Sequence, residues 1–210
     1  MAEITMKGKA YRTSGSLPAT GSVAPDFLLT TTDLSDVSLS AYKGSRLILN
    51  IFPSLYTRVC AESIRRFNQM AESLDNTKVL CISRDLPFAH ERFNAQEGID
   101  NVISLSELRN IQFGENYGLR IMDGPFAGLL ARAVIVVDEK HRVVYSEQVS
   151  DVDEEPDYET ALEAARSASG DDVGPEHSVA GEVCTKMPTG EHARLEDDDE
   201  ACDDGRAGNV

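Results

Sequence analysis

This chain of 210 residues has no tryptophan and no apolar run near the roughly 20 residues that a membrane-spanning helix needs. Its first residues, MAEITMKGKAYRT, also lack the apolar stretch of a secretory signal peptide. We therefore expect a protein without a membrane segment, located in the cytoplasm.

The chain has far fewer basic than acidic residues. The chain holds 20 Lys and Arg against 36 Asp and Glu, a formal net charge of −16. Nucleic-acid binding needs a positive footprint that neutralises phosphates, so this balance excludes a nucleic-acid partner. The deficit is steepest near the end of the chain, where residues 167–210 carry 3 basic and 12 acidic side chains.

Cysteine and histidine are few and widely spaced. The four cysteines form no Cys-x-x-Cys pair and no zinc-ligand pattern, and the four histidines show no ligand spacing either. Gly-rich phosphate loops are also missing, so we expect neither a metal nor a bound cofactor. In a reducing compartment the cysteines should be free thiols unless one is catalytic. These residues are Cys60, Cys81, Cys184 and Cys202, and His90, His141, His177 and His192.

Apolar periodicity predicts strands alternating with helices. Residues 46–52 are apolar on both faces, which indicates a central, buried strand. Cys81 lies in a second buried strand and is expected to be an inert core residue. The whole pattern predicts an α/β sandwich with a mixed central sheet. The expected elements are a hairpin over 3–13, strands over 27–32, 37–39, 46–52, 79–82, 102–105, 132–137 and 142–149, and helices over 60–74, 87–96, 106–117 and 156–168.

The composition changes after residue 168. Residues 169–210 are rich in Gly, Asp and Glu, with scattered aliphatic side chains and no aromatic one. Such a segment cannot bury enough apolar surface to offset its chain entropy. We therefore predict a folded domain over residues 1–168 and a disordered acidic tail over 169–210. The tail acts as a solubiliser or, alternatively, as an interaction segment.

One stretch places a single thiol between a strand and a helix. The strand ends at Pro53, which has no N–H of its own and can wall one side of a pocket. Cys60 follows in the first turn of the helix, where free N–H groups and the helix dipole favour the thiolate, the nucleophilic form. Thr57 is placed to be the N-cap, with its hydroxyl directed at the amide or sulfur of Cys60. A purely structural cysteine is the alternative.

Three blocks of sequence, taken in their order along the chain, indicate a family. The first is Pro-x-x-x-Thr-x-x-Cys, which begins within NIFPS; the second is LCISRDLPFAHERF, and the third is DGPFAGLLARAVIVVDE. Together they resemble the thiol peroxidase (Tpx) branch of the peroxiredoxin family, from about Glu3 to Arg166. The resemblance implies a thioredoxin-like three-layer sandwich with a mixed central sheet and an N-terminal β-hairpin. It also implies reduction of hydrogen peroxide and of alkyl or lipid hydroperoxides.

The resemblance assigns roles to four residues. Cys60 attacks the peroxide and becomes a sulfenic acid, while Pro53, Thr57 and Arg132 shape and polarise the site. Arg132 opens an otherwise apolar strand, and Arg is seldom buried without a partner. A strand-end charge that reaches solvent is the alternative for Arg132. For Arg58, which follows Thr57, we favour a role in surface solubility, and added positive potential near Cys60 is the alternative.

One residue of the family pattern is missing. Where thiol peroxidases carry a resolving cysteine, in a stretch like RFCxxEG, this chain has Asn94. The favoured route for reducing oxidised Cys60 is therefore an external thiol, such as thioredoxin, glutaredoxin or a low-molecular-weight thiol. The alternative is attack by Cys184 or Cys202, whose acidic neighbours weaken them as nucleophiles.

Two functions follow from these residues. The first is an enzyme, a thiol-dependent peroxidase that turns over with a thioredoxin-linked reductant and, by the family resemblance, forms a homodimer. The second is a peroxide sensor or redox-relay protein, which passes its oxidation to a partner with little turnover of its own.

Overall fold

The structure is a computed structural model that describes residues 2–168. The predicted tail over residues 169–210, with Cys184 and Cys202, lies outside the described residues, so the boundary after residue 168 stays a prediction. The elements are β1 (Glu3–Met6), β2 (Lys9–Arg12), β3 (Leu28–Thr31), β4 (Asp36–Ser38), η1 (Leu39–Tyr42), β5 (Arg46–Ile51), α1 (Arg58–Ala71), β6 (Thr77–Ser83), α2 (Pro87–Glu97), β7 (Ile103–Ser106), α3 (Gln112–Asn116), β8 (Ala133–Val137), β9 (Val143–Gln148) and α4 (Tyr158–Ser167).

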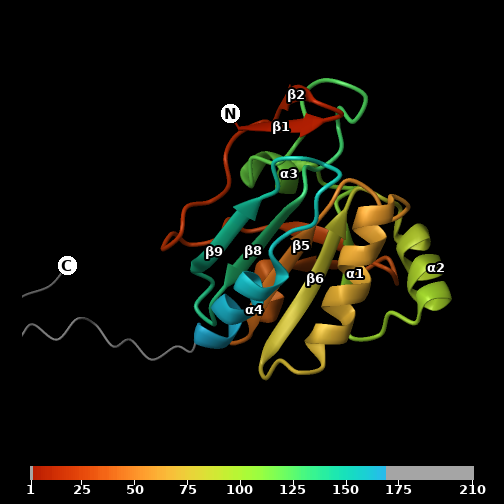
Figure 1. Ribbon diagram of the computed structural model, residues 1–210. Coiled ribbons are helices and arrows are strands. Elements are labelled where there is room, and N and C mark those ends of the chain that lie inside the picture. Colours follow the sequence, from red (N-terminus) through yellow and green to blue (C-terminus); the bar gives the residue numbers. More distant parts are fainter. Residues whose placement is uncertain (1, 169–210) are drawn as a thin grey trace, which may run out of the picture. The chain divides into compact units, whose positions relative to one another are not determined.

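Seven strands form one mixed sheet in the order β4-β3-β7-β6-β5-β8-β9, and β1 pairs with β2 in a separate hairpin (Figure 1). Strand β5 lies in the interior of the sheet, parallel to β6 and antiparallel to β8. Its side chains alternate between two apolar layers, Leu47, Leu49 and Ile51 in one and Ile48 in the other, and none of the four is exposed. The prediction of a strand buried on both faces is confirmed.

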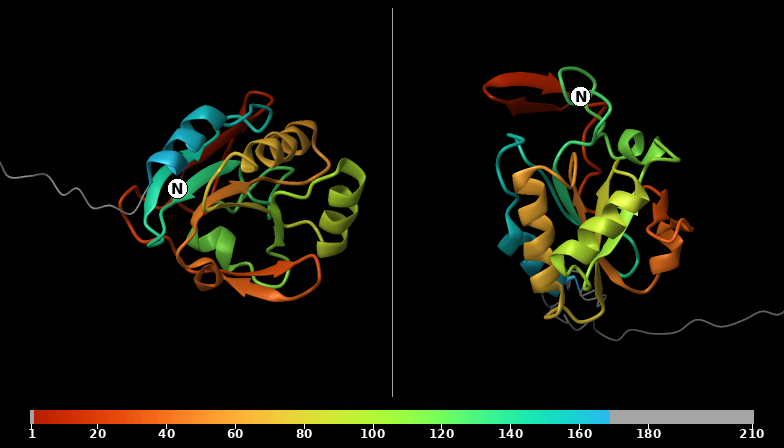
Figure 2. Two further views of the ribbon diagram at one scale, coloured as in Figure 1. Left: turned by 90° about the horizontal axis from the view of Figure 1, so that it is seen from below. Right: turned by 90° about the vertical axis from the view of Figure 1, so that its right-hand side faces the viewer.

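Helices cover both faces of this sheet. Helices α1, α2 and α4 pack on one face, and α3 lies on the other together with η1 (Figure 2). The arrangement is a three-layer α/β sandwich with an N-terminal hairpin, as predicted. Within the described part of the chain, every helix is too short or too polar to span a bilayer.

Two predicted elements are wrong in extent. The helix expected over residues 106–117 is confined to Gln112–Asn116, because the amides of the residues before it are bonded elsewhere. The Glu107 amide donates to the Ser83 carbonyl, and the Leu108 amide donates to the Ser106 hydroxyl. The strand expected over residues 37–39 is Asp36–Ser38, and a 3₁₀ helix then begins at Leu39.

Helix α2 places a histidine in the buried layer. His90 has no exposed surface, and its Nε2 lies 3.0 Å from the Ser83 Oγ at the end of β6. Its Nδ1 is buried without a hydrogen-bond partner among the described residues. Burial lowers the pKa of His90 to about 4, against a smaller opposing effect of the Asp85 carboxylate. The folded protein therefore holds this imidazole neutral at physiological pH.

We predict that the folded state loses stability as the pH falls from 6.5 towards about 4. In this window the unfolded chain protonates His90 and the folded chain does not, so protons favour unfolding. The loss from this residue is on the order of 3 kcal/mol. Urea unfolding at neutral pH and near the lower end of the window measures it. A smaller pH-dependent loss is expected for His90→Gln than for wild type, and equal losses would contradict the prediction.

Candidate active site

Strand β5 and helix α1 place Cys60 as the sequence predicts. Thr57 is the N-cap residue of α1, with an extended backbone at φ −87° and ψ 144°, and Cys60 lies in the first turn. The thiol has no exposed surface and packs in the apolar layer with Phe52 and Leu55. The nearby N–H groups at the start of the helix favour an anion at this position.

Arg132 lies beside this sulfur although 72 residues separate the two in sequence. Ala133, the first residue of β8, pairs with Ile51, the last residue of β5, so the sheet itself brings Arg132 to the start of α1. The Arg132 Nη2 lies 3.3 Å from the Cys60 Sγ and also donates to the Val152 carbonyl at 3.1 Å. Arg132 is 1% exposed, so the alternative of a strand-end charge reaching solvent is wrong.

The guanidinium of Arg132 has hydrogen-bond donors that no described residue accepts from. Its Nε and Nη1 are buried and have no hydrogen-bond partner among the described residues. An unpaired buried donor carries a desolvation cost of about 1–3 kcal/mol, and more when the group is charged. These N–H groups are therefore available to an oxygen-bearing ligand beside the sulfur.

A pocket of about 80 Å³ lies at the start of α1, lined by residues next to Cys60 and by Arg132, while the fully buried Cys60 is not itself part of the lining. Three residues predicted for the site, Pro53, Thr57 and Arg132, line it. Its volume suits a group of a few atoms, since one water occupies about 30 Å³ of liquid volume. The remaining lining residues are Arg58, Val59, Phe126, Val152 and Asp153.

One expectation about this turn needs correction. The Thr57 hydroxyl is not directed at Cys60: it makes no cap hydrogen bond and donates instead to the Ser54 carbonyl at 3.4 Å. The Thr57 amide donates to the same carbonyl at 3.3 Å, so a closed turn fixes the side chain. Arg58 is exposed, as a surface role requires, and it also lines the pocket.

The carboxylate of Asp85, just beyond β6, anchors the turn that carries Thr57. It accepts hydrogen bonds from the Ser54 Oγ at 2.9 Å, the Leu55 N–H at 2.8 Å and the Ser83 Oγ at 2.7 Å. Hydrogen bonds to a charged acceptor are stronger than neutral ones. Asp85 therefore fixes the wall of the pocket that begins at Pro53, a role that the sequence did not reveal.

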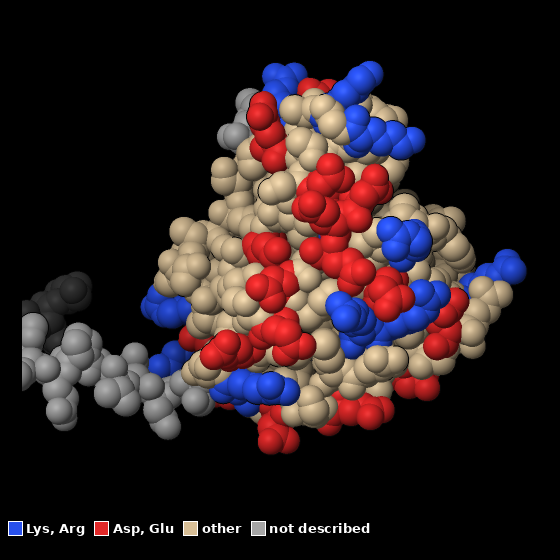
Figure 3. Space-filling view, in the orientation of Figure 1, with Lys and Arg blue, Asp and Glu red and all other residues tan. Residues whose placement is uncertain are grey.

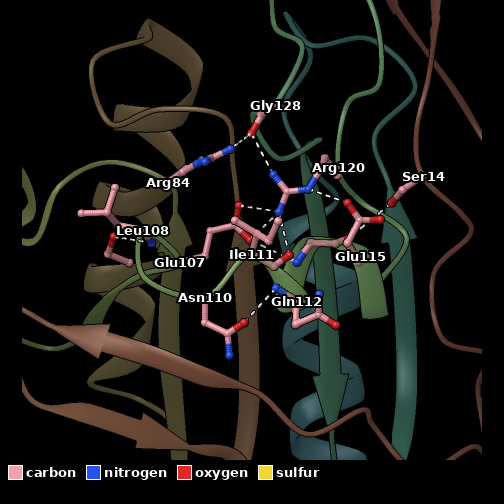
Figure 4. Close-up of polar contacts among 12 residues, drawn as sticks. Ser14, Arg84, Glu107, Leu108, Asn110, Ile111, Gln112, Glu115, Arg120 and Gly128 are labelled. Carbon is pink, nitrogen blue, oxygen red and sulfur yellow. Dashed lines mark hydrogen bonds and ion pairs between the residues drawn. The ribbon is translucent and has the colours of Figure 1, made fainter.

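A second network fixes the opposite wall, which includes Phe126. The Gly128 carbonyl accepts from the Arg84 Nη1 at 2.8 Å and from the Arg120 Nη1 at 3.1 Å (Figure 4). Arg120 also pairs with the fully buried Glu107, with 3.2 Å between its Nη2 and Oε1. Burial raises the pKa of Glu107, and the Arg120 guanidinium opposes the rise. Only the tertiary fold brings these residues together, so no spacing in the sequence predicts them.

Two further residues of interest lie away from the pocket lining. Cys81 is fully buried in β6, and burial raises the pKa of its thiol to about 12, so the expectation of an inert core residue is met. Asn94 lies on α2, where its Nδ2 donates to the Ser104 Oγ at 3.0 Å. Across residues 2–168, no group of three or more His, Cys, Asp or Glu side chains is arranged to hold a metal ion.

Comparisons with known proteins show the family of the chain. The family model described as Redoxin matches residues 19–162. The thiol peroxidases of Mycobacterium bovis and Mycobacterium tuberculosis are each 50% identical to the chain over 164 residues, which is 78% of this chain and 98% of theirs.

Solved structures show the same fold. A peroxiredoxin-like protein from Aquifex aeolicus aligns with a TM-score of 0.74 at 30% identity, covering 79% of this chain and 97% of that one. A thiol peroxidase from Chromobacterium violaceum aligns with a TM-score of 0.73 at 22% identity, covering 78% and 95%. The second likeness supports the fold alone.

We predict that Asp85→Asn slows oxidation of Cys60 by hydrogen peroxide by roughly tenfold to a hundredfold, because small misplacements of site residues have effects of this size. The amide cannot accept all three hydrogen bonds, so the turn from Pro53 to Thr57 loosens. Stopped-flow oxidation with a sulfenic-acid trap measures the rate.

Asp138→Asn is the matched control. Asp138 anchors the β8–β9 turn through the amides of Lys140 and Arg142, and the length of β8 separates this turn from Arg132. Equal rates for the two folded variants would contradict the role given to Asp85.

Proposed function

Because the chain belongs to the Redoxin family and is a peroxiredoxin-type thiol peroxidase, we propose that Cys60 attacks the peroxide with the Arg132 guanidinium beside it. The observation that carries this proposal is the 3.3 Å contact between the Arg132 Nη2 and the Cys60 Sγ, together with the two unpaired donors of the same guanidinium. A positive charge beside the sulfur favours its thiolate, and the unpaired N–H groups can bind a peroxide oxygen.

The proposed step balances as follows. The Cys60 thiolate attacks one oxygen of ROOH, an S–O bond forms and the O–O bond breaks. Sulfur loses two electrons to the peroxide, leaving Cys60 as sulfenic acid. The leaving RO⁻ takes up a proton and departs as ROH. Arg132 stabilises the negative charge that builds on the leaving oxygen.

Thr57 and Pro53 receive the peroxide in this proposal. Because the Thr57 hydroxyl donates to the Ser54 carbonyl, its oxygen is left to accept a hydrogen bond from the O–H of the peroxide. Pro53 forms a wall that offers no N–H, so it does not compete for the peroxide oxygens. Together these groups orient the peroxide towards the sulfur.

We propose that an external thiol, such as thioredoxin, reduces the sulfenic acid. Asn94, at the position where the resemblance expects a resolving cysteine, cannot form a disulfide with Cys60. Since the Cys60 sulfur is fully buried, a protein thiol reaches it only after the turn from Pro53 to Thr57 moves aside. Hydrogen peroxide and organic hydroperoxides are the proposed substrates, and a cytoplasmic homodimer is the proposed working form.

The catalytic assignment is tested by substitution at Cys60 and Arg132. Cys60→Ser should abolish peroxide consumption, whereas Cys81→Ala should keep it, because Cys81 is an inert core thiol. Arg132→Lys should lower kcat/KM for hydrogen peroxide by about a hundredfold, the scale on which one preorganised donor acts. Arg109→Lys, which keeps the charge of an exposed residue paired with Asp36, is the control. Full activity of Cys60→Ser would overturn the assignment.

The route of reduction is tested by intact-mass analysis and peptide mapping after one equivalent of peroxide. We expect a trappable sulfenic acid at Cys60 both in wild type and in Cys184→Ser/Cys202→Ser. A disulfide from Cys60 to Cys184 or Cys202 in wild type would overturn the external route. Sustained turnover with a thioredoxin system is also expected, and a single stoichiometric burst would favour the relay function instead.

A further inference from the structure

The pocket at Arg132 continues into a larger groove. A second cavity, of about 440 Å³, shares the residues Phe126, Val152 and Asp153 with the pocket beside Cys60. Its other lining residues are four from the hairpin and Pro125, namely Met6, Lys7, Lys9, Tyr11 and Pro125. The groove therefore extends from the pocket lined by Arg132 to the hairpin of β1 and β2.

One face of the hairpin forms a wall of this groove. In the β1–β2 register Met6 lies opposite Lys9 and Ile4 lies opposite Tyr11, so these four side chains share one face. Lys7 and Gly8 make the turn, both with positive φ. The hairpin contributes the apolar side chains of Met6 and Tyr11 to the groove lining, together with Lys7 and Lys9 at and beside the turn, whereas Ile4 is buried.

The two walls of the groove are pinned together. Arg12 binds Asp123 with 2.9 Å from its amide to Oδ1 and 3.1 Å from its Nε to Oδ2. A Cβ at Gly124 would lie 2.1 Å from the Tyr11 ring, so only glycine permits this approach. The groove is thus built into the fold before any ligand arrives, which lowers the ordering cost of binding.

Charge is distributed unevenly along the groove. Asp153 lines the part shared with the inner pocket, whereas Lys7 and Lys9 line only the outer part. Neither lysine is ion-paired with any residue in the described range. Figure 3 shows basic side chains gathered over the hairpin and a band of acidic side chains below them. An anionic group is therefore disfavoured near Asp153 and favoured at the hairpin turn.

We propose that this groove is a binding subsite for the chain of an amphipathic hydroperoxide, with Lys7 and Lys9 pairing with a carboxylate at the far end. The proposal rests on the proposed function, because it places the hydroperoxide group at Arg132 and Cys60. The apolar chain lies against Met6, Tyr11 and Phe126. The enzyme thereby selects the free acid of a long-chain hydroperoxide over its neutral ester.

The test compares kcat/KM for a long-chain fatty-acid hydroperoxide and for its methyl ester, both kept below micelle formation. Wild type should favour the acid about fivefold, the size expected for two exposed charge pairs, and the preference should shrink as salt is added. Lys7→Gln/Lys9→Gln should bring the ratio close to one, mainly through KM. Asp153→Asn should raise it.

Lys43→Gln/Lys78→Gln is the matched control, because it removes two exposed lysines outside the groove lining. It should keep the wild-type ratio. A wild-type ratio of one, or a ratio that Lys7→Gln/Lys9→Gln does not lower, would overturn the subsite.

Failure of the proposed function would look different. In that case wild type would not consume tert-butyl hydroperoxide, a substrate too short to reach the lysines. Calorimetric binding of the corresponding hydroxy fatty acid and its methyl ester to Cys60→Ser tests the subsite without turnover. Tighter binding of the acid, lost on adding Lys7→Gln/Lys9→Gln, would support it, and equal binding of acid and ester would overturn it.

Discussion

The contact between the Arg132 guanidinium and the Cys60 sulfur is the interaction on which the rest of the site depends. The two groups come from different elements. The thiol belongs to the first turn of α1, and the guanidinium belongs to the residue that directly precedes β8. Antiparallel pairing of β5 with β8 joins them, because Ile51 and Ala133 are opposite one another. A one-residue slip of that register would turn Arg132 to the other face of the sheet. The central sheet is therefore also the device that assembles the site.

The same contact has a cost in stability. Arg132 is almost fully buried, with two donors unpaired in the described part of the chain, and buried charge is expensive without compensation. A structure optimised only for stability would pair those donors or replace the side chain with an apolar one. In the proposed function these two donors have an acceptor during the reaction, because a peroxide oxygen binds to them.

The sequence predicts the local features of the site well and the tertiary ones poorly. Pro53, Thr57 and Cys60 lie within eight residues, so their arrangement follows from a strand, a turn and a helix start. Arg132 needed the family resemblance, since nothing in an apolar strand says which element lies opposite its first residue. Asp85 was missed for the same reason. The direction of the Thr57 hydroxyl depends on a turn carbonyl that no propensity specifies.

Larger elements show the same division. Strand β5 and helix α1 follow from apolar periodicity, which is a property of consecutive residues. The helix expected over residues 106–117 is shorter because the Glu107 and Leu108 amides are bonded to Ser83 and Ser106. The Glu107 side chain also pairs with Arg120 in the interior, and a local pattern carries no information about these partners. Errors of this kind concentrate where a polar side chain has a distant, buried counterpart.

Arg84 and Asp85 are adjacent in the chain, yet one holds the Gly128 carbonyl and the other holds the turn at Ser54 and Leu55. A single dipeptide just after β6 is thus bonded to both chain segments that contribute to the pocket, the one that follows Pro53 and the one that follows Phe126. The spacing of these two segments is therefore coupled at one position in the chain. Redesign of the pocket for bulkier peroxides would begin at this dipeptide.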